Sequence, residues 1–288
     1  MDYSRIGREI VDQACSAKDE EAEVYIKTIS GIDIDVCEGK LENFNTPSGS
    51  GIGVRIFFRN RMGFAYSTGF DRDSMERLIQ QAKANALNGT PDDYNSLPQV
   101  RGESKASDFF PEGLFDEELA RIPVEAKVEK IREMVEKALA YDRRLKRVPR
   151  ASYSDSQYEI YIFNSKGFEG SYKGTHCSCG LIALAEAKTF SNEGIKEIQV
   201  GSDFSVRRKI KEIDFNQLAR NAARRAVSLL GAKRLRTQRA SAVFEPVVFS
   251  GFLSLIGRGL GADFIQKEKS PFLKKKRKKI AKEIVNII

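Results

Sequence analysis

The chain contains no tryptophan and only a single histidine, His176, among its 288 residues. One histidine excludes a metal site built from several imidazole ligands. No stretch approaches the roughly 18 apolar residues that a membrane-spanning helix needs. Residues 1–17 form an amphipathic pattern rather than a positive flank followed by an apolar run, so they predict no secretory signal. We therefore expect a cytoplasmic protein with no membrane association.

Cysteine is also scarce, at four residues, and in a reducing compartment these side chains are expected to be free thiols. Cys177 and Cys179 alternate on a predicted strand, which places both thiols on one face and His176 on the opposite face. A Cys-x-Cys pair without a second pair is weak evidence for a metal or redox site. Two small strand residues are the favoured interpretation, and no metal or cofactor is predicted.

The net charge of +8 is unevenly distributed. Residues 233–288 contain 14 Lys and Arg against 4 Asp and Glu, whereas the rest of the chain holds 34 basic and 36 acidic residues. The most basic run begins at Lys274 and ends at Lys279. It could contact phosphates, but the aromatic residues that base stacking requires are not interleaved with it. A solvated charged segment is the favoured interpretation, and a nucleic-acid partner is not expected.

A glycine-rich run occupies residues 49–53, which read Gly-Ser-Gly-Ile-Gly. A phosphate-binding loop would open a helix and continue with Gly-Lys-Ser/Thr, whereas this run precedes a strand pattern. Glycines that let a loop enter a hairpin are the favoured interpretation.

Apolar residues recur at helical spacing in five segments. The predicted helices are residues 3–17, a helix capped by Asp71 or Asp73 that runs to residue 87, 124–139, 214–230, and a buried apolar helix at 247–260. In the third of these, Lys127 is placed on the outer, charged face together with its charged neighbours.

Alternation of apolar and polar residues predicts strands between these helices. Residues 22–28 and 32–36 predict one hairpin around Ser30 and Gly31, and residues 53–58 and 62–68 predict a second around residues 59–61. Further strands are predicted at 148–154, 158–164, 167–187, 195–201 and 242–244.

These patterns predict an α+β fold: an N-terminal domain of antiparallel strands with flanking helices, followed by part of a second, strand-rich C-terminal domain. The expected boundaries are an N-terminal domain at 1–122 with a long polar loop at 88–122, a middle region of helix, β-meander and helix at 123–232, and the start of a C-terminal domain at 233–288.

Three separated blocks of sequence resemble the TldD/PmbA family, whose members were first described as modulators of DNA gyrase. The first block reads Ser-Gly-Ile-Gly-Val-Arg at 50–55 and Arg-Met-Gly-Phe-Ala-Tyr-Ser-Thr at 61–68. The second covers residues 142–148, 153–156 and 162–167, and the third covers 229–233 and 243–246. Their order and spacing fit the family along essentially the whole chain.

Members of that family are either TldD-like, with a His-Glu-x-x-x-His zinc motif, or PmbA-like, without it. The resemblance places Leu253 and Arg258 where the two zinc-binding histidines would be and Ser254 where the glutamate would be. Leucine cannot ligate zinc, arginine repels a cation, and serine is no general base for a metal-bound water. The resemblance therefore implies a PmbA-like chain that is not catalytic alone.

The resemblance further implies a role in proteolysis or peptide maturation, as a homodimer or as a heterodimer with a TldD-like zinc subunit that acts on peptides or unfolded proteins. A protein that binds DNA gyrase or nucleic acid remains the alternative. Family members also continue past Ile288, so the resemblance implies a chain truncated at its C-terminus. A non-functional fragment is a third interpretation, in which residues 247–260 would expose apolar surface for lack of packing partners.

Overall fold

The computed structural model describes residues 1–15, 19–98, 112–188 and 196–282. The chain divides into two compact units, residues 1–232 and residues 233–288. Each unit is described by itself.

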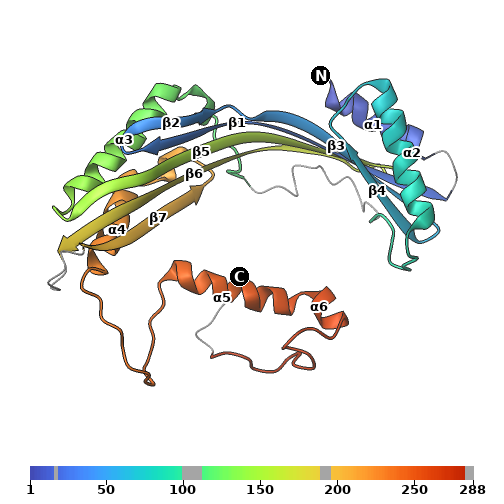
Figure 1. Cartoon of the computed structure of the whole chain (residues 1–288). Coiled ribbons are helices and arrows are strands. Elements are labelled where there is room, and N and C mark those ends of the chain that lie inside the picture. Colours follow the sequence, from blue (N-terminus) through green and yellow to red (C-terminus); the bar gives the residue numbers. More distant parts are fainter. Residues whose placement is uncertain (16–18, 99–111, 189–195, 283–288) are drawn as a thin grey trace. The chain divides into compact units, whose positions relative to one another are not determined.

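The first unit is built on a curled antiparallel sheet that has seven strands among the described residues (Figure 1). The strand order is β4-β3-β1-β5-β6-β7, and β2 pairs with the far part of β1. The strands are β1 (Glu20–Cys37), β2 (Lys40–Asn45), β3 (Ser48–Phe58), β4 (Arg61–Ser67), β5 (Leu145–Asn164), β6 (Glu169–Lys188) and β7 (Lys196–Arg207). The long strands β1, β5 and β6 connect one end of the sheet with the other.

Helices cover one face of this sheet at both ends: α1 (Tyr3–Ala14) and α2 (Arg72–Asn88) at one end, and α3 (Val124–Ala140) and α4 (Phe215–Ser228) at the other (Figure 1). Two short 3₁₀ helices, Leu119–Arg121 and Ile210–Glu212, come shortly before α3 and α4 in the sequence. Alternate residues of β1 reach both cores. Val24 and Ile26 pack in the core of the first pair, and Ile34 and Val36 in that of the second. The opposite face of the sheet, called the open face below, carries no helix of the described part of this unit.

Aspartate side chains fix where three of these helices begin. Carboxylate oxygens of Asp2, Asp71 and Asp214 accept hydrogen bonds from backbone N–H groups three residues ahead, at 3.0, 2.9 and 2.9 Å. Such caps satisfy amide groups that have no partner within the helix. The predicted cap at Asp71, the four helices of this unit and the hairpin around residues 59–61 are confirmed.

Two strand predictions are wrong. β1 runs unbroken through Ser30 and Gly31, so residues 22–36 form no hairpin, and β5 joins the two strands expected at 148–154 and 158–164. Gly31 has a packing role instead of a turning role, because a Cβ there would lie 2.3 Å from the backbone oxygen of Asp155 on β5. Pairing on both sides keeps β1 extended at residues that locally favour a turn.

The expected polar loop at 88–122 is only partly described, since residues 99–111 lie outside the described residues. Its two ends are held by the fold. Leu97, Asp116 and Leu119 are buried, and the carboxylate of Asp116 accepts a hydrogen bond from the Ile210 N–H at 3.2 Å.

The second unit contains α5 (Pro246–Leu260) and α6 (Ala262–Gln266), and its described residues include no strand, so the strand expected at 242–244 is absent. Helix α5 is present where predicted, but the prediction that it is buried is wrong. Gly259 is its one buried residue, packed against Phe272, whereas Phe249, Phe252 and Leu255 are exposed. No described helix of either unit is long and apolar enough to cross a membrane.

Candidate functional site

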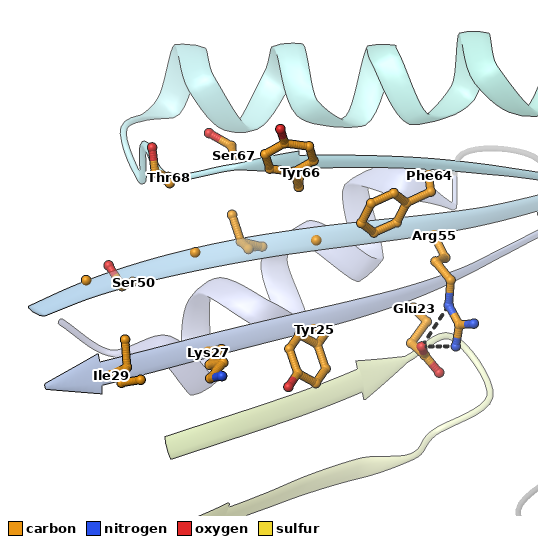
Figure 2. Close-up of a pocket in the computed structure, with 14 residues that line it drawn as sticks. Glu23, Tyr25, Lys27, Ile29, Ser50, Arg55, Phe64, Tyr66, Ser67 and Thr68 are labelled. Carbon is orange, nitrogen blue, oxygen red and sulfur yellow. Dashed lines mark hydrogen bonds and ion pairs between the residues drawn. The ribbon is translucent and has the colours of Figure 1, made fainter. Parts of the chain in front are cut away.

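A groove of about 640 Å³ lies on the open face of the sheet, over β1, β3 and β4 (Figure 2). It occupies the side of these strands opposite α1 and α2, because Tyr25 and Lys27 alternate along β1 with Val24 and Ile26, which enter the first core. Strand β3 supplies the floor, and β1 and β4 supply the two walls. The lining residues are Glu23, Tyr25, Lys27, Ile29, Gly49, Ser50, Gly51, Ile52, Gly53, Arg55, Phe64, Tyr66, Ser67 and Thr68.

The strand register sets which wall residue stands beside each floor residue. Gly53 of β3 pairs with Tyr25 on β1 and with Tyr66 on β4. Gly51 and Gly49 pair with Lys27 and Ile29 on β1. The groove is therefore narrow over Gly53, between two tyrosines, and open over the other two glycines.

One end of the groove is closed by an ion pair between Arg55 and Glu23 (Figure 2). The guanidinium Nε donates to a Glu23 carboxylate oxygen at 3.0 Å. Phe64, the β4 partner of Arg55, leans from that end toward the floor, so that a Cβ on Gly53 would lie 3.0 Å from its ring.

The walls are mainly aromatic and neutral. Burial, followed by the nearby Tyr172 and Tyr158 hydroxyls, raises the pKa of Tyr25, which keeps its hydroxyl protonated. Phe64 and Tyr66 stack with ring centroids 6.4 Å apart. Glu23 is the one carboxylate in the lining and is paired with Arg55, so these residues suit apolar binding better than acid–base catalysis.

The residues that the sequence aligned with a zinc motif, Leu253, Ser254 and Arg258, all lie on α5 in the second unit. Leu253 is half-buried, and the other two are exposed. The Ser254 hydroxyl donates back to the Ser250 carbonyl at 3.0 Å, a bond made within the helix itself.

The predicted arrangement of the Cys-x-Cys pair is confirmed. Cys177 and Cys179 are buried in the second core, whereas His176 is exposed on the open face. The two thiols contact groups of the core itself. The Cys177 thiol donates to the Arg207 carbonyl at 3.4 Å, and the Cys179 sulfur lies 3.7 Å from the Met134 sulfur. Within the described residues, no group of three His, Cys, Asp or Glu side chains is placed to hold a metal ion.

Sequence profiles of one protein family match the chain in three consecutive parts. Residues 22–86 match "PmbA/TldA metallopeptidase domain 1", residues 117–230 match the central domain of the same family, and residues 237–288 match its C-terminal domain. The chain belongs to the PmbA/TldD family. The groove lies within the part that matches domain 1, and α5 lies within the part that matches the C-terminal domain.

Curated relatives in the PmbA/TldD family are distant. Metalloprotease PmbA of Escherichia coli O157:H7 is 25% identical over 258 residues, which cover 88% of this chain and 55% of that protein. A Metalloprotease PmbA homolog of Buchnera aphidicola is 25% identical over 256 residues, covering 87% of this chain and 54% of the relative. The chain thus spans about half the length of the curated relatives it matches.

Two solved structures of this kind confirm the fold. A protein of Bacteroides thetaiotaomicron, solved under the name of a modulator of DNA gyrase, superposes with a TM-score of 0.82 at 20% identity, over 98% of this chain and 62% of that one. TldE from Thermococcus kodakarensis gives a TM-score of 0.71 at 20% identity, over 94% and 57% of the two chains. At this identity the likeness concerns the fold alone.

Sequence reasoning did not identify the groove. It assigned Gly49 and Gly51 to a loop, whereas both lie in β3. A signal was available, because glycine stands at positions 49, 51 and 53 while Ile52, Val54 and Ile56 stand between and beyond them. That period of two is typical of a strand with one bare face.

Proposed function

We propose that this chain is a PmbA-type, non-catalytic subunit of a metallopeptidase pair that acts on peptides or unfolded polypeptides. The observation that carries the proposal is the identity of three residues on α5, within the part that matches the family's C-terminal domain. Leu253, Ser254 and Arg258 stand where the resemblance implies His, Glu and His.

The chemistry of these side chains argues against hydrolysis by this chain at that position. A zinc hydrolase needs imidazole or carboxylate ligands and a base that takes a proton from the metal-bound water. The side chain of Leu253 has no lone pair, and the guanidinium of Arg258 is a fixed cation. The catalytic metal would be supplied by a TldD-like partner subunit, in a heterodimer.

An activity assay tests whether this chain is non-catalytic and assists a catalytic zinc subunit. Reduced, carboxymethylated lactalbumin labelled with fluorescein serves as the unfolded substrate, and acid-soluble fluorescence measures cleavage. We expect no cleavage by this chain alone, and several-fold faster cleavage by the mixture than by a family member with the His-Glu-x-x-x-His motif alone. Elemental analysis after gel filtration should find no stoichiometric zinc on this chain.

A matched variant sharpens the test. Ser254→Ala should support the zinc subunit as well as the unaltered chain does, because Ser254 has no catalytic part in the proposal. Chelator-sensitive cleavage by this chain alone, or tightly bound stoichiometric zinc, would contradict the proposal.

A second candidate function, binding of DNA gyrase or nucleic acid, is favoured by one observation. All six side chains of the basic run 274–279 are exposed. Neutralising phosphates with such a run gives binding that weakens steeply with salt. A gel shift with duplex DNA that falls between low and physiological salt, and disappears when residues 274–279 are replaced by Ser and Gln, would support this candidate. Salt-independent absence of a shift would remove it.

A further inference from the structure

Strand β3 presents bare backbone at three successive positions of the open face, Gly49, Gly51 and Gly53. Ile52 and Val54, which alternate with Gly51 and Gly53 along β3, fill the first core on the other face. Glycine weakens a strand because it has no side chain to pack and loses more backbone entropy on folding than other residues. Three glycines at alternate positions of one strand therefore require a structural or functional explanation.

Packing within the first unit does not explain why glycine is needed at Gly49 and Gly51. A Cβ on Gly49 would meet nothing within 4 Å, and one on Gly51 would have a nearest neighbour at 3.6 Å, an ordinary contact. Neither residue has the positive φ that favours glycine. By contrast, a Cβ on Gly63 would lie 2.1 Å from the Ala82 carbonyl oxygen of α2, and one on Gly201 would lie 2.2 Å from the Ala226 nitrogen of α4.

We infer that the space over Gly49 and Gly51 is kept free for a ligand, and that this ligand is an extended polypeptide segment that carries an aromatic side chain. The segment lies along β3 with its aromatic ring against Tyr25 and Tyr66. This inference rests on the proposed function in one respect only, that polypeptide is the substrate of the pair.

The dimensions of the groove favour a polypeptide over a small aromatic molecule. From Gly49 to Arg55 the floor advances six residues, or about 20 Å at roughly 3.3 Å per residue. That length accommodates about six residues of an extended chain, whereas a single aromatic ring would occupy only a part of it.

The walls favour an aromatic side chain in that segment. Tyr25, Phe64 and Tyr66 are all exposed along the groove, and aromatic rings gain from edge-to-face and offset contacts beyond the burial of their area. Lys27 also lines the β1 wall, and its ammonium lies 5.6 Å from the centre of the Tyr158 ring on β5. Bare glycines allow the two backbones to approach closely.

Peptide binding to the full chain tests the inference directly. The probes are fluorescein-labelled heptapeptides of alternating Ser and Thr with either Phe or Ala at the centre, and fluorescence anisotropy measures the dissociation constants. We expect the Phe peptide to bind about ten-fold or more tightly than the Ala peptide, since burying a phenyl ring has that effect. Gly51→Val should weaken the Phe peptide at least ten-fold while leaving the urea midpoint equal or higher, because valine favours strands.

Matched controls separate the groove from the rest of the sheet. Gly180 also lies in a strand, on β6 of the open face, and a Cβ there would meet only ordinary contacts at 3.5 Å and beyond. Gly180→Val should leave peptide binding unchanged. If Gly51→Val does not fold, Tyr66→Ser removes an exposed wall ring and should weaken the Phe peptide in the same way.

Several results would contradict binding of an aromatic polypeptide segment in the groove. Equal binding of both peptides, or unchanged binding in Gly51→Val and Tyr66→Ser, would overturn it. Displacement of the Phe peptide by N-acetylphenylalanine amide at an equal concentration would show that a small aromatic molecule suffices, and would overturn the polypeptide assignment. Failure of the unaltered chain to stimulate a zinc subunit would instead count against the proposed function, whatever the peptides do.

Discussion

Lys127 and Asp155 form an ion pair inside the second core. The Lys127 ammonium on α3 lies 2.5 Å from a carboxylate oxygen of Asp155 on β5, with side chains only 2% and 5% exposed. The Tyr153 hydroxyl donates to the same oxygen at 2.8 Å. The sequence prediction that Lys127 lies on the outer face of its helix is wrong. Position 127 lies four residues before the buried Ile131, on the apolar stripe, and its charge concealed this in the sequence.

Removing one member of this pair should destabilise the fold strongly. Lys127→Met leaves the Asp155 carboxylate buried without its cation, and we expect it to lower the free energy of unfolding by about 3–5 kcal/mol. The double variant Lys127→Met/Asp155→Leu should recover most of that loss. Urea titrations followed by circular dichroism measure both values.

A surface pair provides the control for that experiment. Arg72 and Glu76 are 89% and 50% exposed, so Arg72→Ala should change the free energy of unfolding by less than about 0.5 kcal/mol. An equally small effect of Lys127→Met would show that the buried pair is not formed.

The two core thiols predict how stability changes at alkaline pH. Burial raises the pKa of Cys177 to about 11 and that of Cys179 to about 12. An unfolded thiol ionises near pH 8.5, so stability is full below that pH and is lost as pH rises toward 11 to 12. We expect a loss of about 1–2 kcal/mol per thiol between pH 8 and pH 10.

The double variant Cys177→Ala/Cys179→Ala isolates this effect from other titrations. Its stability should fall less between pH 8 and pH 10 than that of the unaltered chain, as measured by urea titration at both pH values. Parallel losses in the two proteins would contradict a contribution from these thiols.

At the scale of helices and strands, the sequence predicted what is coded locally. The four helices of the first unit were found because each segment contains its own apolar stripe, and three of the four also begin at a capping aspartate. The continuity of β1 was not predicted, because Ser30 and Gly31 carry a turn signal. Pairing of β1 with β3 and β5 overrides that signal. The groove was missed for the same reason. Its walls depend on the register of three strands, which no single segment specifies.

Strand β7 presents a row of exposed apolar residues on the open face at the opposite end of the sheet from the groove. Ile198 and Val200 are each 51% exposed and Phe204 is 62% exposed. In the described part of the sheet, β7 pairs with β6 alone and is an edge strand. Edge strands with apolar faces favour association with other chains.

We therefore expect the isolated chain to self-associate as its concentration rises, through this surface. Val200→Thr/Phe204→Thr should shift sedimentation velocity profiles toward the monomer with an unchanged circular dichroism spectrum, because threonine keeps strand propensity while reducing apolar area. A monodisperse monomer for the unaltered chain across the concentration range would count against the prediction.

At the scale of the whole chain, the second compact unit begins with residues 233–245, which lead from residue 232 to the start of α5. This segment forms no helix or strand, all of its residues are exposed, and it contains four basic residues, Lys233, Arg234, Arg236 and Arg239. The two compact units meet between residues 232 and 233. The domain boundaries expected at 122/123 and 232/233 stay predictions, and the sheet of the first unit draws strands from both sides of residue 122.

Limited proteolysis tests this division. Trypsin should cut first among these four basic residues, because exposed backbone without hydrogen-bonded structure is the preferred substrate of a protease. Mass spectrometry should then identify a fragment that ends between residues 233 and 239 and resists further digestion. First cleavage within β5 or β6 would contradict the division.

The order of strands in the sheet also determines when the first unit can be completed during synthesis. The core beneath α1 and α2 includes Phe163, contributed by β5, and Gly7 of α1 packs against its ring. β1 ends at Cys37, so roughly 125 further residues, or about 6–25 s of translation, pass before Phe163 is made. Over that interval the nascent β1 has an unpaired edge and an incomplete core. We expect the ribosome-bound chain to be a client of chaperones until β5 emerges from the exit tunnel.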